Sequence, residues 1–248
     1  MTCRRIAWLT AVAFLATALA AENRVPVVVE LFTSEGCSSC PPADQLLARL
    51  DQAQPVPQAD VLVLEEHVDY WDQQGWRDPF SSRFFTLRQQ SYARAFAAED
   101  VYTPQMVVDG HEAFNGADGT RALREIRNAA AASHASLSLR RKDDATVTLS
   151  VDRFPGGIKN VEIVVAVTEE ALSSNVLHGE NAGRRLSHAR VARSLESIAR
   201  FDARKSPAYS ADAALRLPPE WNRTHLRVLG FVQDRDSRRI IGAASLQP

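Results

Sequence analysis

The alternation of apolar and polar positions predicts strands and helices between residues 25 and 132. Residues 25–32, VPVVVELF, are β-branched and almost continuously apolar, as in a strand covered on both faces. A second run of this kind, Val61-Leu62-Val63-Leu64, follows a loop that contains two prolines. Between the two runs, Leu46, Leu47 and Leu50 have helical spacing. The pattern therefore predicts a strand-helix-strand unit with buried parallel strands.

The next part of the chain predicts a helix, a hairpin and another helix. Ser81 can cap a helix that runs to about Ala98, with aromatic side chains on one face. The Asp109-Gly110 dipeptide then separates two strand-like runs, which is the strongest short-range signal of a β-hairpin. A last helix is expected over residues 120–132. The predicted fold class is α/β.

After about residue 135 the pattern changes to short strands with few turn glycines. This predicts a second, mostly antiparallel β domain. The arginine-rich segment 179–202 fits neither a helix nor a strand. The predicted organisation is thus residues 1–20 as a signal peptide, 21–134 as a first domain and 135–248 as a β-rich domain. The expected strands of the second domain cover residues 137–141, 146–151, 161–168, 226–232 and 239–245.

The first twenty residues resemble a targeting signal. Arg4 and Arg5 precede an uncharged apolar stretch, Ile6 to Leu19, and small residues follow at 18–20. This stretch of about 14 residues is shorter than the roughly 20 needed to cross a bilayer. We therefore expect a cleaved secretory signal peptide, a periplasmic or secreted protein, and no membrane association after cleavage.

Composition narrows the possible partners. The 248 residues carry 29 lysines and arginines against 30 aspartates and glutamates, so there is no excess of positive charge to bind a phosphate backbone. We therefore expect no nucleic-acid partner. No motif indicates an organic cofactor, and the oligomeric state is left open.

The candidate chemistry lies in Cys37-Ser38-Ser39-Cys40, where a strand passes into a helix. A zinc site is disfavoured because the chain has neither a second cysteine pair nor a His-x-x-x-His spacing. A sulfur at a helix N-terminus is instead stabilised as thiolate, which would make Cys37 the nucleophile and Cys40 the resolving thiol. Glu35 opposes that ionisation. Two prolines directly after Cys40 indicate that the helix begins at Cys40.

The order of elements over residues 25–132 resembles the thioredoxin fold. In that fold the proline before the penultimate strand is cis and packs against the cysteine pair, which implies this role for Pro104, with Thr103 before it. Thioredoxins also carry a buried acid six residues before the first cysteine, whereas Glu30 lies seven before Cys37. The resemblance implies that Glu30 accepts the proton of the resolving thiol.

Longer motifs resemble a more specific family. The segments VVVELFTSEGCSSCPPAD, HVDYWDQQGWRDPFSSRF, VYTPQMVVDG, GENAGR and GFVQD are similar to a secreted bacterial family described as domain of unknown function 1223. The likeness spans both halves of the chain. This resemblance implies no particular activity.

Three functions remain open. The favoured hypothesis is thiol-disulfide exchange through Cys37 and Cys40 with protein thiols or disulfides, because a short-range pair removes little unfolded-state entropy and is therefore a poor stabiliser. The first alternative is a secreted binding module whose disulfide is only structural. The second is copper binding or delivery by Cys37, Cys40 and His67, which resembles thioredoxin-like copper proteins.

The remaining polar candidates are weaker. The aromatic loop, residues 67–80, is expected to pack as a lid over the cysteine pair. Its acids Asp69, Asp72 and Asp78 do not have the spacing of a calcium loop. For His111 and His188 the sequence identifies no partner.

Overall fold

The structure is a computed structural model that describes residues 24–246. The expected signal peptide, residues 1–20, lies outside the described residues. Within them, no helix has the length and apolar character needed to cross a membrane. The first half of the described chain contains β1 (Val25–Thr33), α2 (Pro41–Ala53), β2 (Ala59–His67), α3 (Arg83–Ala95), β3 (Gln105–Val108), β4 (Glu112–Asn115) and α4 (Gly119–Ala130).

The second half is built from strands. Its elements are β5 (Ser136–Asp143), β6 (Thr146–Arg153), β7 (Asn160–Glu170), β8 (Ser173–Asn175), β9 (Arg185–Ser187), β10 (Arg190–Asp202), β11 (Tyr209–Ala214), a 3₁₀ turn η1 (Arg223–His225), β12 (Leu226–Asp234) and β13 (Ile240–Leu246).

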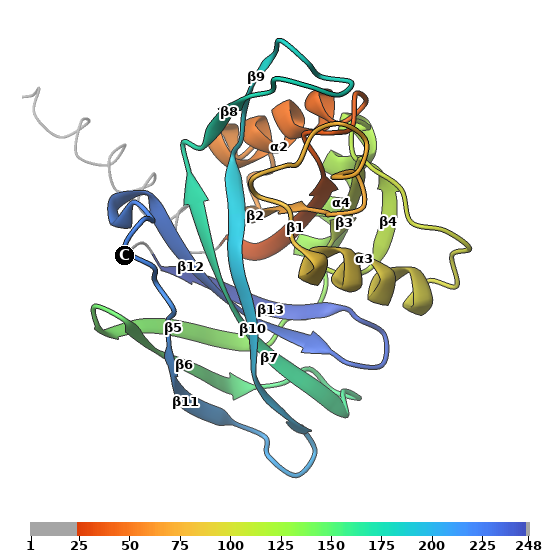
Figure 1. Cartoon of the computed structure of the whole chain (residues 1–248). Coiled ribbons are helices and arrows are strands. Elements are labelled where there is room, and N and C mark those ends of the chain that lie inside the picture. The colour runs from red at the N-terminus through yellow and green to blue at the C-terminus, as the bar shows by residue number, and fades with distance from the viewer. Residues whose placement is uncertain (1–23, 247–248) are drawn as a thin grey trace, which may run out of the picture.

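Both halves contribute to one mixed sheet of eight strands in the order β13-β12-β7-β10-β2-β1-β3-β4 (Figure 1). In the first half β1 pairs in parallel with β2 and antiparallel with β3, and β3 pairs antiparallel with β4. The halves meet where Val191 of β10 pairs in parallel with Glu65 of β2. The molecule is therefore a mixed α/β protein in which the two predicted regions share a sheet.

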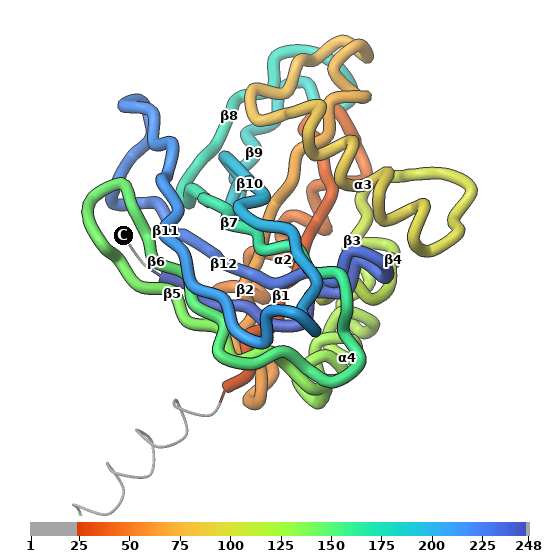
Figure 2. The backbone as a smooth tube through the Cα atoms, turned by 90° about the horizontal axis from the view of Figure 1, so that it is seen from below, coloured from red at the N-terminus to blue at the C-terminus, as the bar shows by residue number. Residues whose placement is uncertain are grey.

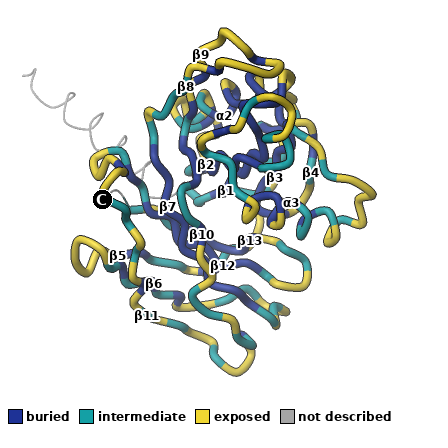
Figure 3. The backbone as a smooth tube through the Cα atoms, in the orientation of Figure 1, coloured by how far each residue is buried: buried dark blue, intermediate teal, exposed yellow. Residues whose placement is uncertain are grey.

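The helices cover both faces of the first half. Alternate residues of β1, such as Val27 and Val29, pack with α2 and α4, whereas Val28 faces α3. Strands β11, β6 and β5 form a second, three-stranded sheet (Figure 2). The apolar side chains of this sheet pack against β7, β12 and β13. The main sheet is buried along most of its length (Figure 3).

One core cluster joins the halves. Val28, Leu62 and Phe85 of the first half pack with Leu229 and Phe231 of β12. The same cluster includes Leu64, Val164, Ala166, Ala192, Leu195, Ile240 and Ala243. The interface between the halves is therefore an apolar core.

A turn makes a second junction. The Asp109-Gly110 hairpin forms as the sequence predicts, and the carbonyl of Asp109 accepts a 2.8 Å hydrogen bond from the amide of Ile240. Gly110 has φ +60, and a Cβ there would lie 2.0 Å from the carbonyl oxygen of Arg238. Only glycine fits this close approach.

The arginine-rich segment was the main element that sequence reasoning missed. Residues 179–202 supply β9 and the 13-residue strand β10, which lies inside the main sheet. Two register shifts against β7, between Ala192 and Ser194 and between Ser197 and Ala199, interrupt the alternation of apolar and polar residues. A strand without that alternation gives no clear sequence signal.

Candidate functional site

Cys37 and Cys40 form a disulfide with 5.4 Å between their Cα atoms. The pair lies in the turn after β1, and both cysteines are fully buried. Ser38 and Ser39, between them, are exposed. A reactant therefore meets the serines first, and it reaches the sulfurs only if the surrounding chain moves.

The N-terminus of helix α2 stabilises a cysteine thiolate only weakly. Cys40 is its N-cap and the two prolines occupy the first helical positions, as their sequence positions indicated. The amides of Ala43 and Asp44 both donate to the carbonyl of Cys40, at 2.8 and 3.1 Å, so neither of them faces a sulfur. The usual lowering of a cysteine pKa at a helix N-terminus is therefore weak here.

Thr103-Pro104 is a cis peptide bond, as the resemblance implied. Pro104 is buried beside α2, since a Cβ on Gly116 would lie 3.1 Å from both Pro104 and Ala43. The hydroxyl of Thr103 accepts a 2.8 Å hydrogen bond from the indole of Trp71. This proline and the cysteine pair thus lie at the same end of α2.

The aromatic loop packs against the cysteine turn. The Cβ of Trp71 lies 3.1 Å from where a Cβ of Gly36 would be. The indole of Trp76 donates a 2.8 Å hydrogen bond to the carboxylate of Glu35. The Cβ of Trp71 and the indole of Trp76 therefore contact the two residues that immediately precede Cys37.

A second cover comes from the β8–β9 hairpin, whose tip, residues 176–184, we call the capping loop (Figure 1). The buried amide of Asn181 donates to the carbonyls of Glu35, at 2.9 Å, and Cys37, at 3.0 Å. The carboxylate of Glu180 accepts from the amide of Ser38 at 3.0 Å. The GENAGR motif signalled this loop in the sequence, but nothing in the sequence indicated where it would dock.

Glu30 lies on the face of β1 that packs against α3. Its contacts there differ from those expected for the proton acceptor that the resemblance implied. Its carboxylate accepts hydrogen bonds from Arg88, at 2.6 Å, and from the hydroxyl of Tyr92, at 2.5 Å. Glu66 is next to this ion pair, and burial together with the charge of Glu30 raises its pKa well above the usual range. These contacts give Glu30 a structural role, and its proton-acceptor role stays a prediction that they do not favour.

A buried network of histidines and carboxylates lies behind the cysteine turn. His188 bonds to Glu65 through Nδ1, at 2.7 Å, and to Glu35 through Nε2, at 2.9 Å. His67 bonds to Asp78 through Nδ1, also at 2.7 Å. The partners of His188, which the sequence did not reveal, come from β2 and the cysteine turn.

The network shifts the pKa values of its members. Burial disfavours ionisation, yet the adjacent His188 and His67 lower the pKa of Glu65 to about 2. Burial also opposes the charged imidazoles, but Glu65 and Glu35 raise the pKa of His188 to about 9, and Asp78 raises that of His67. In this network the negative carboxylates and the positive imidazoles therefore stabilise each other's charged forms.

Asp44 lies one turn into α2, beside this network. Its carboxylate accepts a 2.6 Å hydrogen bond from the hydroxyl of Thr33. Burial, followed by the charge of Glu65, raises its pKa to about 7. Asp44 is thus a buried acid in the helix that follows the cysteine pair. Nothing at its position in the sequence indicated that it would be buried.

The copper site proposed from Cys37, Cys40 and His67 is not formed here. The disulfide occupies both sulfurs, and His67 is held by Asp78. In residues 24–246 the group that could hold a metal is instead Glu65, His67 and His188. His111 lies elsewhere, beside Arg239, at an exposed position.

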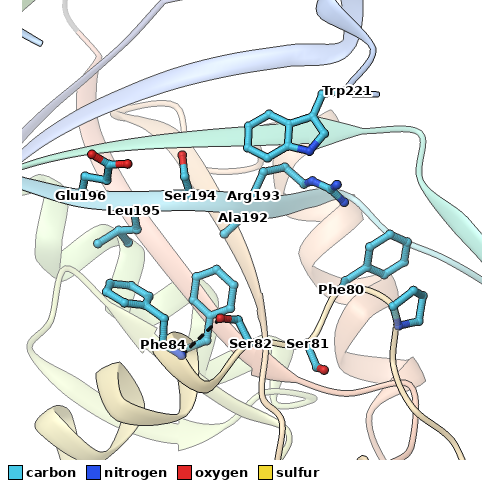
Figure 4. Close-up of a pocket in the computed structure, with 12 residues that line it drawn as sticks. Phe80, Ser81, Ser82, Phe84, Ala192, Arg193, Ser194, Leu195, Glu196 and Trp221 are labelled. Carbon is cyan, nitrogen blue, oxygen red and sulfur yellow. Dashed lines mark hydrogen bonds between the residues drawn. The ribbon is translucent and has the colours of Figure 1, made fainter. Parts of the chain in front are cut away.

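An open pocket lies on the other side of the network, between the start of α3 and β10, with a volume of about 350 Å³ (Figure 4). The guanidinium of Arg193 lies 5.1 Å from the ring centre of Trp221 and 5.9 Å from that of Phe80. The Phe80 ring in turn contacts the rings of His67 and His188 edge-on, at 5.4 and 5.3 Å. Phe80 therefore separates the pocket from the network.

Comparison with solved structures finds similarity over almost the whole chain. A crystal structure of an Agrobacterium tumefaciens protein, solved in a structural genomics programme, is 27% identical with a TM-score of 0.68, and the alignment covers 90% of this chain and 94% of that one. A domain of the outer membrane lipoprotein Omp28 from Porphyromonas gingivalis is 11% identical over 46% of this chain and 88% of that chain, but its TM-score is only 0.28.

The search of curated proteins finds no match. The family model described as protein of unknown function (DUF1223) matches residues 28–233. Because this match spans most of the sequence, the chain belongs to the DUF1223 family.

Proposed function

We propose that this chain is a secreted, thioredoxin-like protein that exchanges disulfides through Cys37 and Cys40. The observation that carries the proposal is the disulfide at the start of α2, which shares that end of the helix with the cis Thr103-Pro104 bond. The strand order β2-β1-β3-β4, with β1 and β2 parallel, supports the thioredoxin-like assignment. The apolar N-terminal stretch supports export to the periplasm or beyond.

The exchange follows ordinary thiol-disulfide chemistry. A substrate thiolate attacks Sγ of Cys37, a mixed disulfide forms, and Cys40 leaves with the electron pair of the broken bond and takes up a proton. A second substrate thiolate then displaces Cys37. In sum, two electrons and two protons pass from a substrate dithiol to the cysteine pair, and the reverse sequence reduces a substrate disulfide.

The surroundings of the pair indicate a low reduction potential. The weak helix contribution and the carboxylate of Glu180, which binds the amide of Ser38, disfavour thiolates. A disulfide is harder to reduce when its thiolates are less stable. We therefore expect a potential near the reducing end of the range of working oxidoreductases, at about −270 mV.

The capping loop makes exchange dependent on a local opening. Replacing Asn181 with alanine removes two hydrogen bonds to the cysteine turn, which together contribute roughly 1–3 kcal/mol. The disulfide of Asn181→Ala should therefore be reduced by glutathione about tenfold faster or more. Leu177→Ala is the matched control, because Leu177 is an exposed residue of the same loop.

The test measures the reduction potential against glutathione, by alkylation and mass spectrometry, and the rate of exchange with a peptide disulfide. A potential between about −270 and −120 mV, with exchange lost in Cys37→Ser, supports the proposal. A potential below about −300 mV with no exchange in either the unaltered protein or Asn181→Ala overturns it. In that case the disulfide is structural and the chain is a binding module, the reading that the burial of both cysteines favours.

A further inference from the structure

Three buried side chains from distant parts of the sequence direct potential metal ligands at one point. Glu65 and His67 extend from the end of β2, and His188 precedes β10. Their ligand atoms all lie within 4.8 Å of one another. The Glu65 Oε1 atom is 2.7 Å from Nδ1 of His188 and 3.7 Å from Nε2 of His67.

These separations bracket the spacing that zinc requires. With bonds of about 2.0–2.1 Å in tetrahedral geometry, two ligand atoms on zinc lie roughly 3.3 Å apart. One observed separation, between Glu65 and His188, is shorter than this value, and the other, between Glu65 and His67, is longer. The third separation, between the ligand atoms of His67 and His188, is at most 4.8 Å. Adjustments of no more than about 1.5 Å would therefore place all three atoms on one ion.

One nitrogen in the group has no hydrogen-bond partner. Nε2 of His67 is buried and makes no hydrogen bond, although its neighbour Nδ1 is firmly held by Asp78. A buried polar atom without a partner costs about 1–3 kcal/mol. A metal ion bonded to Nε2 would remove that cost.

Each of the three potential ligands also makes a hydrogen bond to a neighbouring group that fixes its orientation. Asp78 accepts from Nδ1 of His67, Glu35 binds Nε2 of His188, and the amide of Ala189 donates to Oε2 of Glu65 at 2.6 Å. Carboxylates that bind the far nitrogen of a metal-bound histidine fix its orientation and raise its basicity. Each of the two imidazoles here has such a carboxylate on its far nitrogen.

We propose that Glu65, His67 and His188 bind a divalent transition-metal ion of the zinc type. Two imidazoles and one carboxylate form the ligand set that zinc takes in sites with an open fourth position. A cavity of about 440 Å³ beside Asp51 and Arg190 reaches His188, and it gives an ion a route from solvent. This site is independent of the sulfurs, so it stands whether or not the cysteine pair is redox-active.

The experiment is equilibrium dialysis of the oxidised, metal-stripped protein against Zn²⁺, with metal counted by mass spectrometry. We expect one zinc per chain with a Kd below about 1 μM. His67→Ala and His188→Ala should each weaken binding about 100-fold or more, and Asp78→Asn about 10- to 100-fold through the loss of orientation. His111→Ala is the matched control and should bind zinc normally, because His111 is exposed and remote from the site.

A second measurement keeps the test independent of the folding of the variants. Co²⁺ added to the unaltered protein should give the visible absorption of a four- or five-coordinate ion with nitrogen and oxygen ligands, and excess Zn²⁺ should remove it. Absence of that spectrum overturns the proposal. Zinc binding that is as tight in folded His67→Ala and His188→Ala as in the unaltered protein also overturns it, and the buried network is then a set of ion pairs.

Discussion

Arg88→Met should destabilise the protein by about 3–5 kcal/mol, because it leaves the buried carboxylate of Glu30 without its counterion. Arg88 and Glu30 are almost completely buried, and their Nε and Oε1 atoms are 2.6 Å apart. The guanidinium also lies 5.2 Å from the ring centre of Tyr92 and 5.5 Å from that of Phe231, so methionine replaces much of its apolar contact but none of its charge. The predicted loss is thus mainly electrostatic.

The pH dependence of this loss has a definite sign. Without Arg88, the folded variant can neutralise its unpaired buried charge only by taking up a proton. The folded variant then holds a proton that the unfolded chain has released, so its stability falls as pH rises above about 4. The difference from the unaltered protein should therefore be larger at pH 8 than at pH 5.

Urea denaturation followed by far-UV circular dichroism gives the free energies of unfolding. The double variant Glu30→Gln/Arg88→Met should be more stable than the sum of the single changes predicts, because it leaves no buried charge unpaired. A loss below about 1 kcal/mol for Arg88→Met, or a loss of equal size at both pH values, would refute the reasoning. If Glu30 served the resolving thiol instead, Glu30→Gln would shift the reduction potential of the cysteine pair, and we expect no such shift.

Three further predictions concern packing, protonation and the aromatic loop. Gly116→Ala should lower the free energy of unfolding by roughly 1–3 kcal/mol, since its Cβ would lie 2.6 Å from a methyl of Leu31, and thermal melting would show this. Burial raises the pKa of Asp109 to about 8, so the stability of the unaltered protein should fall between pH 4 and pH 8 by up to about 1.4 kcal/mol per pH unit. Urea titrations should show a slope that is smaller by about this amount in Asp109→Asn, whose amide oxygen can still accept from the amide of Val28. Trp71→Phe, which loses its bond to Thr103, should cost about 1 kcal/mol, and a loss indistinguishable from zero in urea would mean that the indole does not hold the loop.

The elements that depend on local sequence signals could be predicted. The apolar run of β1 and the proline pair after Cys40 each act on their immediate neighbours, so both the strand and the start of α2 could be predicted. The hairpin at Asp109-Gly110 belongs to the same class. These elements also place the cysteine pair correctly at the junction of a strand and a helix.

The contacts that complete the site are not local. Asn181 reaches Cys37 across 144 residues, and His188 reaches Glu65 across 123. No periodicity relates such positions, and a single sequence carries no record of which side chains meet after folding. The bulged strand β10, which brings His188 to β2, has no regular alternation to reveal it. The contacts within the buried network therefore could not be predicted from the sequence, although each of its residues can be read there.

The continuous sheet limits how this protein can evolve by exchange of parts. A module that packs only through loops can be moved between genes, because its neighbours lose little when it leaves. Here Val28 and Leu62 share a core with Phe231, and one edge of β2 pairs with β10. A gene fragment ending near residue 134 would expose that edge and that apolar face together, and such a strand edge invites aggregation. The two halves must therefore be inherited, and must diverge, as a single unit.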